Sequence, residues 1–501
     1  MSSELGTVVS TFESPTTGIF AFVVTGKGVR KGQFVQAETE DGLLIGNVTE
    51  IARANRYFER PESVADYEKS APISASFPSA DWDYAIAKVR ALGIFNDGKL
   101  ARSLYPAAPG AKVFPADASP LKEFLGFAET GLHVGDLQNN SLNAKLGLAR
   151  LLQKHLAILA MSGAGKSYLC GVLIEELLDR KASDGRLAVI VVDPHGEYSA
   201  YSQGDYADRT SVFDCSESRI ALRRVSSAAF AEWVPHLSHT QRRELSKILA
   251  EMKLETKNSG ESFDLNDLIG RIEGAEIKEN IKDPLLAWLS ELKSLKLFAK
   301  GERPKISELC VPGKLSVLDM SSIDNLRKKQ MLVSYFAKRL FKLRKKGEIP
   351  PFVLLIEEAH NFCKEKAEKS SAISKSIIET IAREGRKFGA SLCLVSQRPV
   401  QLSTTALSQC NTQIILRVTN PYDLKHIAES CEGIDNETLG TITTLRVGDA
   451  LIIGEAVNYP VFVRVRKRRS KVVARGESLA DMARAFEANK AKKKEDVGAF
   501  I

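Results

Sequence analysis

The stretch ILAMSGAGKSYLCG, at residues 158–171, contains the residue types of a loop that wraps phosphate groups. The pattern G-x-x-x-x-G-K-[ST] matches at Gly165, Lys166 and Ser167, but Ala160 stands where the pattern has its first glycine. A loop of this kind holds a triphosphate with backbone N–H groups at the start of a helix, where the helix dipole favours negative charge. Position 160 ends the preceding strand, so we expect a methyl group to be tolerated there.

Two side chains of this loop supply the chemistry expected of a site for ATP and Mg²⁺. Lys166 can reach the β- and γ-phosphate oxygens, and the Ser167 hydroxyl can ligate magnesium. The alternative is a loop whose glycines are purely structural, but the expected strand and helix stand where the motif requires them. The predicted nucleotide contacts are Ser162, Gly163, Ala164, Gly165, Lys166, Ser167 and Tyr168.

Two adjacent acids end another apolar run, in FVLLIEE. We predict that Glu357 holds the magnesium through water and that Glu358 polarises the attacking water as a general base. Many ATPases of this type have aspartate at the first position, so Glu357 differs in length but not in charge. The apolar residues directly before the pair argue against the alternative, an exposed acidic helix start.

Asp193 and Gln397 end two further apolar runs. Asp193 could orient water or magnesium, or it could cap the turn through Pro194 and Gly196, and the sequence leaves both interpretations open. Gln397 is placed where an amide could sense the γ-phosphate and relay its loss to the loops that follow.

The segment SKSIIETIAREGRKFG presents Arg383 and Arg386 at helical spacing. A guanidinium can neutralise transition-state charge on the γ-phosphate, and it commonly comes from a neighbouring subunit. The alternative is that both arginines pair with Glu379 or Glu384 on a solvated helix. The sequence favours the catalytic role for Arg383 and neither role for Arg386.

These residues need a sheet to position them. Apolar runs near 187–193, 351–360, 390–399, 412–418 and 449–457 look like buried parallel strands that alternate with helices, which predicts an α/β fold with helices on both faces of the sheet. The β-branched segments of the first hundred residues predict a small antiparallel barrel. The predicted divisions are the barrel and its connector at 1–125, the core at 126–222 and 310–460, a helical insertion at 223–309 and a basic C-terminal segment at 461–501.

Composition narrows the class of protein. The 44% apolar and 26% charged residues are those of a soluble globular protein, and no apolar run is long enough to cross a membrane. The seven cysteines form no C-x-x-C pair, so we predict reduced thiols and a cytoplasmic location. The net charge of +8 permits a polyanionic partner without requiring one. The C-terminal VRVRKRRSKVVAR can be a solvated, frayed end or a nucleic-acid arm.

With these residues placed, the chain resembles the HerA family of hexameric DNA translocases, which is allied to the FtsK motors. The likeness covers nearly the whole chain and rests on the barrel and on H-L-A-I-L-A, G-A-G-K-S, D-P-H-G-E-Y, I-E-E-A-H-N, A-R-E-G-R-K-F-G and S-Q-R-P in this order. Together these motifs are highly specific, whereas each alone is not. The resemblance implies a HerA-type barrel, a RecA-like P-loop ATPase core, a helical insertion and a C-terminal brace in a homo-hexameric ring.

The resemblance also implies roles for single residues. Glu358 becomes the catalytic acid, and Arg383 becomes the finger given to the neighbouring subunit. Lys154 stands where the family often has an arginine that contacts the nucleotide. Lysine keeps the positive charge but lacks the paired N–H donors of a guanidinium. Tyr459 and Pro460 become candidates for contact with the nucleotide base, because the C-terminal strand of the family can approach it.

The leading functional hypothesis is a ring-shaped ATPase that moves double-stranded DNA through its channel. By resemblance, it acts in DNA end resection with a NurA-type nuclease docked on the barrel side. The alternative is an ATP-dependent ring scaffold that recruits or activates a nuclease or defence effector. A secretion or conjugation pump is disfavoured by the missing transmembrane segment, and a metabolic kinase by the missing acceptor pocket.

Overall fold

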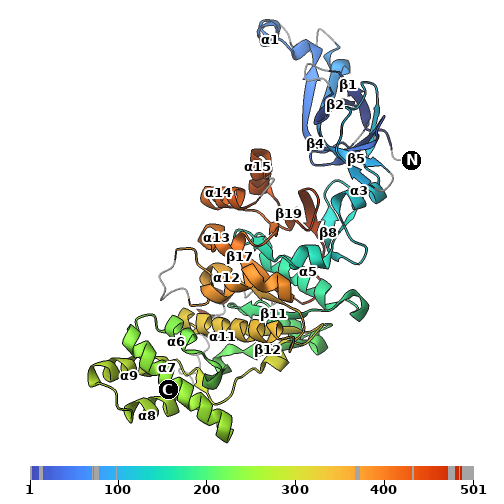
Figure 1. Ribbon diagram of the computed structural model, residues 1–501. Helices are drawn as coiled ribbons and strands as arrows, with labels where there is room; N and C mark the ends of the chain where they lie inside the picture. The colour runs from blue at the N-terminus through green and yellow to red at the C-terminus, as the bar shows by residue number, and fades with distance from the viewer. Residues whose placement is uncertain are drawn as a thin grey trace, which may run out of the picture.

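A barrel, a sheet-based core and a helical insertion follow one another along the long axis of the molecule (Figure 1). The computed structural model describes residues 3–10, 15–26, 28–69, 72, 78–96, 99–366, 373–431, 434–471, 480–484 and 486–487. Of the basic C-terminal segment predicted at 461–501, residues 472–479, 485 and 488–501 therefore lie outside the described residues. Within the described part, no helix is both long and apolar enough to span a membrane.

The N-terminal barrel is closed by a pairing of its second and fifth strands. The strand order is β2-β1-β7-β3-β4-β5, β5 also pairs with β2, and β6 extends the sheet beyond β5. The strands are β1 (Gly6–Val9), β2 (Ile19–Val24), β3 (Phe34–Thr39), β4 (Gly42–Asn55), β5 (Asp83–Asn96), β6 (Lys99–Ala101) and β7 (Lys112–Pro115). Alternate side chains such as Phe20, Phe22 and Leu44 fill the interior, as period-2 patterning requires. The predicted barrel is confirmed.

The core is built on an 11-stranded sheet in the described part of the chain. Its order is β12-β15-β11-β16-β17-β10-β18-β19-β20-β8-β9, with parallel pairing from β12 to β18 and antiparallel pairing from β18 to β9. The parallel strands are β10 (Leu156–Leu159), β11 (Ala188–Asp193), β12 (Thr210–Asp214), β15 (Leu315–Asp319), β16 (Phe352–Ile356), β17 (Ala390–Ser396) and β18 (Thr412–Ile415). The antiparallel strands are β8 (Leu132–Leu137), β9 (Asn143–Leu146), β19 (Asp449–Gly454) and β20 (Val461–Val465).

One strand runs against the direction that its sequence suggests. The run at 449–457 looks like a parallel strand, but β19 pairs antiparallel with β18, so that Gly454 lies opposite Thr412. A continuous apolar run reports burial on both faces and carries no information about direction. The prediction of a parallel strand at this position is therefore wrong, whereas the predicted α/β fold is confirmed.

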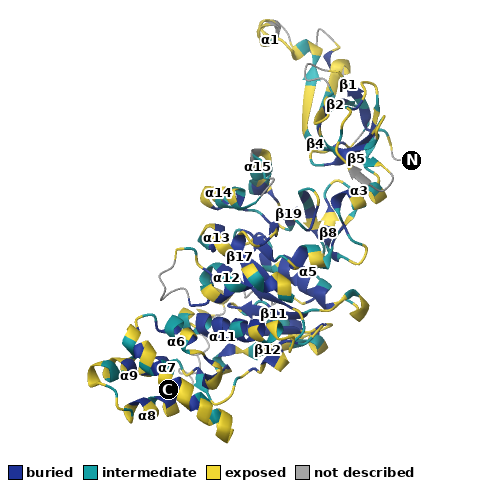
Figure 2. Ribbon diagram, viewed as in Figure 1, coloured by how far each residue is buried: buried dark blue, intermediate teal, exposed yellow. Residues whose placement is uncertain are grey.

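Helices cover both faces of the central parallel strands β11, β16 and β17, which are buried along their length (Figure 2). On one face, Val189 and Val191 of β11 share a hydrophobic cluster with α5 (Lys166–Leu178). On the other face, Ile190 shares a cluster with α11 (Leu326–Lys345) and α12 (Lys375–Glu384). The sheet is therefore held rigidly from both sides, and its carboxyl edge can place side chains accurately.

The insertion is helical, and its long helices lie at the end of the molecule opposite the barrel (Figure 1). Its helices include α6 (Ser227–Trp233), α7 (His239–Ser259), α8 (Leu265–Glu273) and α9 (Glu279–Ser294). Capping boxes at Ser238 and Asp264 start α7 and α8. The remaining elements are α1 (Pro61–Glu68), α3 (Ala118–Leu125), α4 (Leu148–Leu152), α10 (Ile306–Leu309), α13 (Thr404–Leu407), α14 (Pro421–Ser430), α15 (Asn436–Thr444), β13 (Ile220–Ala221) and β14 (Phe298–Ala299).

Candidate nucleotide-binding site

The glycine-rich loop joins the carboxyl end of β10 to the start of α5. Gly163 and Gly165 have φ angles of 77° and 103°, a region that L side chains rarely adopt. Ala160 is fully buried and is not among the residues with positive φ. Its N–H donates to the carbonyl of Ser396 on β17 at 3.2 Å, so position 160 continues the sheet. The structure therefore requires glycine at 163 and 165 but not at 160.

Lys166 lies between the loop and the two acids that follow β16. Its ammonium group donates to Glu357, and its Nζ lies 3.3 Å from Oε1 of Glu358. All three side chains are nearly inaccessible to solvent, with exposures of 7%, 2% and 6%. Burial alone would lower the pKa of Lys166, but the nearby negative charges, led by Glu357, outweigh it and raise the pKa above its ordinary value.

The second carboxylate oxygen of Glu357 is held by Tyr198, which the sequence analysis did not single out. The phenol of Tyr198 is fully buried and donates to Oε1 of Glu357. A buried carboxylate needs partners for its oxygens, and here one comes from the loop helix and the other from the segment after β11. The only sequence signal for this contact was an aromatic residue a few positions after a strand end.

Glu358 is held in a strained backbone conformation at the end of β16. Its φ and ψ angles are 49° and 44°, in the left-handed region that costs a non-glycine residue about 1–3 kcal/mol. Gln397 Nε2 donates to its Oε1 at 2.6 Å, and His360 Nδ1 lies 3.4 Å from its Oε2. Burial lowers the pKa of His360, against the opposing effect of the Glu358 charge. Backbone strain, combined with contacts to Lys166, Gln397 and His360, is typical of a carboxylate whose orientation matters for function.

Asp193 serves the turn that follows β11. Its Oδ1 accepts from the backbone N–H groups of His195, Gly196 and Glu197 at 2.9–3.2 Å, and its Oδ2 accepts from that of Tyr198 at 2.9 Å. Burial raises the pKa of Asp193 to about 6, although these hydrogen bonds favour the charged form. Of the two interpretations of Asp193, the geometry shows the turn cap, and that turn carries Tyr198 to Glu357.

Three residues predicted to contact nucleotide lie at the opposite edge of the sheet. Lys154 precedes β10, and its Nζ pairs with Glu455 at 2.7 Å. Tyr459 and Pro460 precede β20, which runs in the same direction as β10 because two antiparallel pairings separate β20 from β18. Residues before either strand lie at the amino edge, whereas the loop follows β10 at the carboxyl edge. Within one chain, Lys154, Tyr459 and Pro460 are therefore not brought to the loop.

Arg383 and Arg386 lie apart from the buried acids. Arg383 is half-exposed on α12, and its Nη1 is 4.0 Å from Glu379. Arg386 is exposed in the turn that follows α12. An exposed guanidinium near a nucleotide site can act on a neighbouring molecule more readily than on its own.

The loop residues can hold a nucleotide and a hard cation together. Ser162 and Gly163 are exposed, Ser167 is half-buried and Tyr168 is exposed, so the loop opens to solvent above the buried Lys166. Among the described residues, no three His, Cys, Asp or Glu side chains gather around one point. Mg²⁺ is commonly bound by one or two protein groups together with substrate phosphates, and Ser167 and Glu357 fit that pattern.

Comparisons with known proteins agree with this geometry. The family described as "Helicase HerA, central domain" matches residues 132–340. A probable helicase of Methanocaldococcus jannaschii, MJ1565, is 29% identical over 87% of this chain and 86% of its own length. The DNA double-strand break repair helicase HerA of Sulfurisphaera tokodaii is 27% identical over 92% of this chain and 93% of its own.

A solved structure supports the fold alone. VirB4 of Thermoanaerobacter pseudethanolicus, at 14% identity, superposes with a TM-score of 0.53 over 68% of this chain and 97% of its own. With the matched central domain, relatives aligned over most of their length and a P-loop site at the expected sheet edge, the chain is similar to the HerA family over most of its length.

Proposed function

We propose that this chain is an ATP-hydrolysing motor that acts on double-stranded DNA as part of a homo-hexameric ring. The observation that carries the proposal is the convergence of Lys166, Glu358 and Gln397 at the carboxyl edge of the sheet, directly beside the glycine-rich loop. A phosphate-binding lysine, a carboxylate and an amide from three different strand ends are what a hydrolytic P-loop site requires.

Lys166 has to change partners for hydrolysis to occur. Its ammonium group is now neutralised by Glu357 and Glu358, and the phosphate oxygens of ATP would replace them as anionic partners. This exchange releases Oε1 of Glu358 to accept a proton from the attacking water. Bound Mg²⁺, held by Ser167 and Glu357, would offset the charge of the phosphates.

Gln397 is placed to report the state of the site. Its amide donates to Glu358 and it directly follows β17, so a change at the carboxylate reaches the segment Pro399–Gln401 within a few residues. A relay of this length can link hydrolysis to loops that touch a substrate.

A ring accounts for Arg383. The guanidinium of Arg383 is half-exposed while the acids of its own chain are buried, so it can reach the site of a neighbouring molecule more readily than its own. A neighbouring subunit can supply this group, as arginine fingers commonly do.

Double-stranded DNA is supported as the substrate by the relatives and by charge. The HerA relatives carry names that state a role in double-strand break repair. The chain has a net charge of +8, which favours a polyanionic partner. The barrel lies at one end of the molecule, far from the insertion, and we propose that end as the docking side of a NurA-type nuclease in DNA end resection (Figure 1).

Purified protein tests the proposal. Native mass measurement should give a homo-hexamer, and ATP hydrolysis should rise when duplex DNA is added. DNA binding should weaken steeply as salt is raised, because phosphate contacts release counterions. A monomer whose hydrolysis ignores DNA would contradict the motor.

Glu358→Gln separates chemistry from binding. Loss of a general base should lower hydrolysis by about 10²–10⁴-fold while ATP still binds. Glu384→Gln is the matched control, because Glu384 pairs with Lys345 on the surface and should leave the rate unchanged. Nuclease activation that persists in Glu358→Gln would favour the scaffold over the motor.

A further inference from the structure

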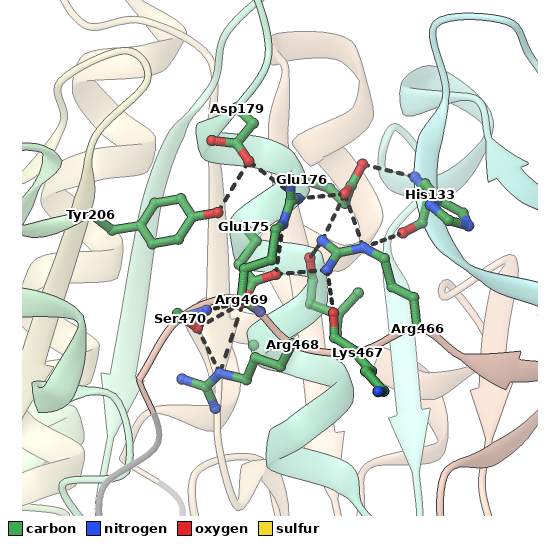
Figure 3. Close-up of polar contacts among 12 residues, drawn as sticks. His133, Glu175, Glu176, Asp179, Tyr206, Arg466, Lys467, Arg468, Arg469 and Ser470 are labelled. Carbon is green, nitrogen blue, oxygen red and sulfur yellow. Dashed lines mark hydrogen bonds and ion pairs between the residues drawn. The ribbon is translucent and has the colours of Figure 1, made fainter. Parts of the chain in front are cut away.

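The segment after β20 lies across the helix that carries the phosphate loop (Figure 3). We call residues 466–471 the C-terminal strap; their sequence is RKRRSK. The sequence suggested either a frayed end or a nucleic-acid arm for this segment. Instead, three of its arginines and its serine contact α5 or the segments beside it, and the strap joins parts of the chain about 300 residues apart.

Glu175 of α5 is the main anchor of the strap. Its side chain is fully buried, and its Oε1 accepts from the backbone N–H of Arg469 at 2.8 Å and from the N–H and hydroxyl of Ser470 at 2.7 Å each. Its Oε2 accepts from Arg466 Nη1 at 2.8 Å. Burial would raise the pKa of Glu175, but these hydrogen bonds outweigh it and the pKa is lowered. The strap therefore supplies the partners that a buried carboxylate must have.

A second set of contacts extends the anchor along α5. Glu176 Oε1 pairs with Arg466 Nη2 at 2.6 Å and with Arg469 Nη2 at 2.8 Å. Arg469 Nη2 also lies 3.1 Å from Asp179 Oδ2 (Figure 3). Two arginines thus pair with three acids along the helix, so these arginines are engaged within the chain.

Arg468 carries the strap from this anchor to the phosphate loop. Its guanidinium is almost fully buried, lies 4.9 Å from the centre of the Tyr201 ring and fills the space above Gly171. Its backbone N–H donates to the Tyr168 hydroxyl at 2.6 Å. Tyr168 directly follows Ser167, so this hydrogen bond ties the strap to the first turn of α5.

The two attachments fix the position of α5 at separate points. Glu175 lies nine residues after Lys166, which is about 13 Å along the helix at 1.5 Å per residue. One anchor near each end of a rigid helix sets both its position and its tilt, and with them the placement of Lys166 and Ser167.

We propose that the C-terminal strap positions the phosphate loop, with Glu175, Ser470 and Tyr168 as positioning residues for nucleotide binding. This proposal rests on the proposed ATP site but goes beyond it. It makes nucleotide affinity depend on a segment that touches no part of the loop except through Tyr168.

Two single-atom changes test the proposal. Tyr168→Phe removes the hydroxyl that accepts from the strap and keeps the ring, and Ser470→Ala removes one donor to Glu175. Each should weaken binding of a fluorescent ATP analogue by about three- to tenfold, the effect of losing one hydrogen bond. In Ser470→Ala the rate at saturating ATP should stay near wild type, because the Ser470 hydroxyl bonds to Glu175 and does not touch the reacting atoms. Tyr84→Phe is the matched control, since Tyr84 and Tyr168 are each 37% exposed and Tyr84 lies on the barrel.

Amide hydrogen exchange without nucleotide separates this proposal from the proposed function. Both variants should exchange faster than wild type across residues 162–171 while other core segments keep their protection. Unchanged affinity and unchanged exchange in both variants would overturn the strap proposal. Wild-type protein that binds no nucleotide, with faster exchange in the variants, would instead overturn the ATP site and leave the positioning role standing.

Discussion

His155 lies directly before β10, and both of its ring nitrogens are hydrogen-bonded to backbone groups of other elements. Nε2 lies 2.9 Å from the carbonyl of Ala382, and Nδ1 accepts from the N–H of Leu392 at 3.0 Å. These partners require a neutral ring with its proton on Nε2. His155 therefore joins α12 and β17 to the start of β10, the strand that precedes the glycine-rich loop, and its role is structural.

This burial makes stability depend on pH. Burial lowers the pKa of His155 to about 4, from an unfolded value near 6.5. Between these values the unfolded chain binds a proton that the folded chain does not, so stability is full above about pH 6.5 and falls as pH drops toward 4. The free energy of unfolding lost through His155 over this pH range approaches about 3 kcal/mol.

Denaturant unfolding of wild type and His155→Gln at pH 7 and pH 5 measures this effect. The stability advantage of the wild type should shrink at pH 5, because glutamine takes up no proton. The comparison is needed because Asp193, with its pKa raised to about 6, shifts stability in the opposite direction in both proteins. An advantage that is constant with pH would show that His155 is protonated in the folded state.

Sequence patterns predicted the residues at the centre of the site better than those at its margins. Lys166, Glu357 and Gln397 each follow a parallel strand, and the carboxyl ends of such strands meet at one edge. Lys154 and Tyr459 were placed by analogy, and their position depends on strand direction, which apolar patterning does not report. Contacts such as that between Glu175 and Ser470 join residues far apart in the sequence, and nothing in either residue type predicts the pairing.

At the scale of elements, α5 packs against both the sheet and the C-terminal strap. Its apolar residues pack against the sheet, while Gly171 leaves room for the guanidinium of Arg468. A Cβ at position 171 would lie 2.7 Å from Cζ and Nε of Arg468, closer than real contacts allow. Gly171 therefore has a packing role that helical propensity alone would oppose.

Gly171→Ala should lower the free energy of unfolding, whereas glycine-to-alanine substitutions inside helices usually raise it. In an exposed helix interior, alanine stabilises by about 1 kcal/mol relative to glycine. In α5 the new methyl group has to displace buried Arg468, and we expect a net loss of about 1–3 kcal/mol, as overpacking typically costs. Gly270→Ala in α8 is the control, because nothing lies within 4 Å of a Cβ there and the change should stabilise. Equal stabilisation by both variants, measured by denaturant unfolding, would contradict the packing of Arg468 on α5.

The strands missed by sequence analysis also have a physical explanation. The parallel strands β12 and β15 extend the sheet beyond β11, and Ser316 interrupts the apolar residues of β15. In β12 the residues are mostly exposed or half-buried, so its sequence lacks the continuous apolar run of a central strand. The central strands β11, β16 and β17 have that run and were predicted.

At the scale of the whole molecule, the barrel is joined to the core by apolar packing, in which Phe34 and Ile45 share a hydrophobic cluster with core residues, and by polar contacts. Asn140 exchanges two hydrogen bonds with the backbone of Phe34. Arg90 pairs with Asp435 at 3.0 Å and Lys31 pairs with Glu437 at 2.7 Å. Exposed ion pairs contribute little stability each, so the buried apolar contacts supply most of the stability of this junction. Lys166, Glu357 and Glu358 are buried, whereas Arg383 is half-exposed.

A mixing experiment tests whether Arg383 completes the site of a neighbour. Lys166→Ala and Arg383→Ala should each be inactive alone, because every site in either ring lacks one group. After equal amounts are dissociated and reassembled at random, about one quarter of the sites combine a native Lys166 with a native Arg383 from the next subunit. ATP hydrolysis should therefore recover to about a quarter of the wild-type rate if sites fire independently.

The control mixture combines Lys166→Ala with Glu358→Gln. Both residues lie on the same side of the site and within one chain, so no subunit in this mixture has both, and activity should stay absent however the subunits assemble. Native mass measurement of subunits with different tags establishes that exchange took place. If exchange is complete and the first mixture stays as inactive as the control, Arg383 serves its own subunit and the site is not shared. Recovery in the first mixture alone requires that each site be built from two chains, because only then can an inactive subunit lend its arginine to a loop that still has its lysine.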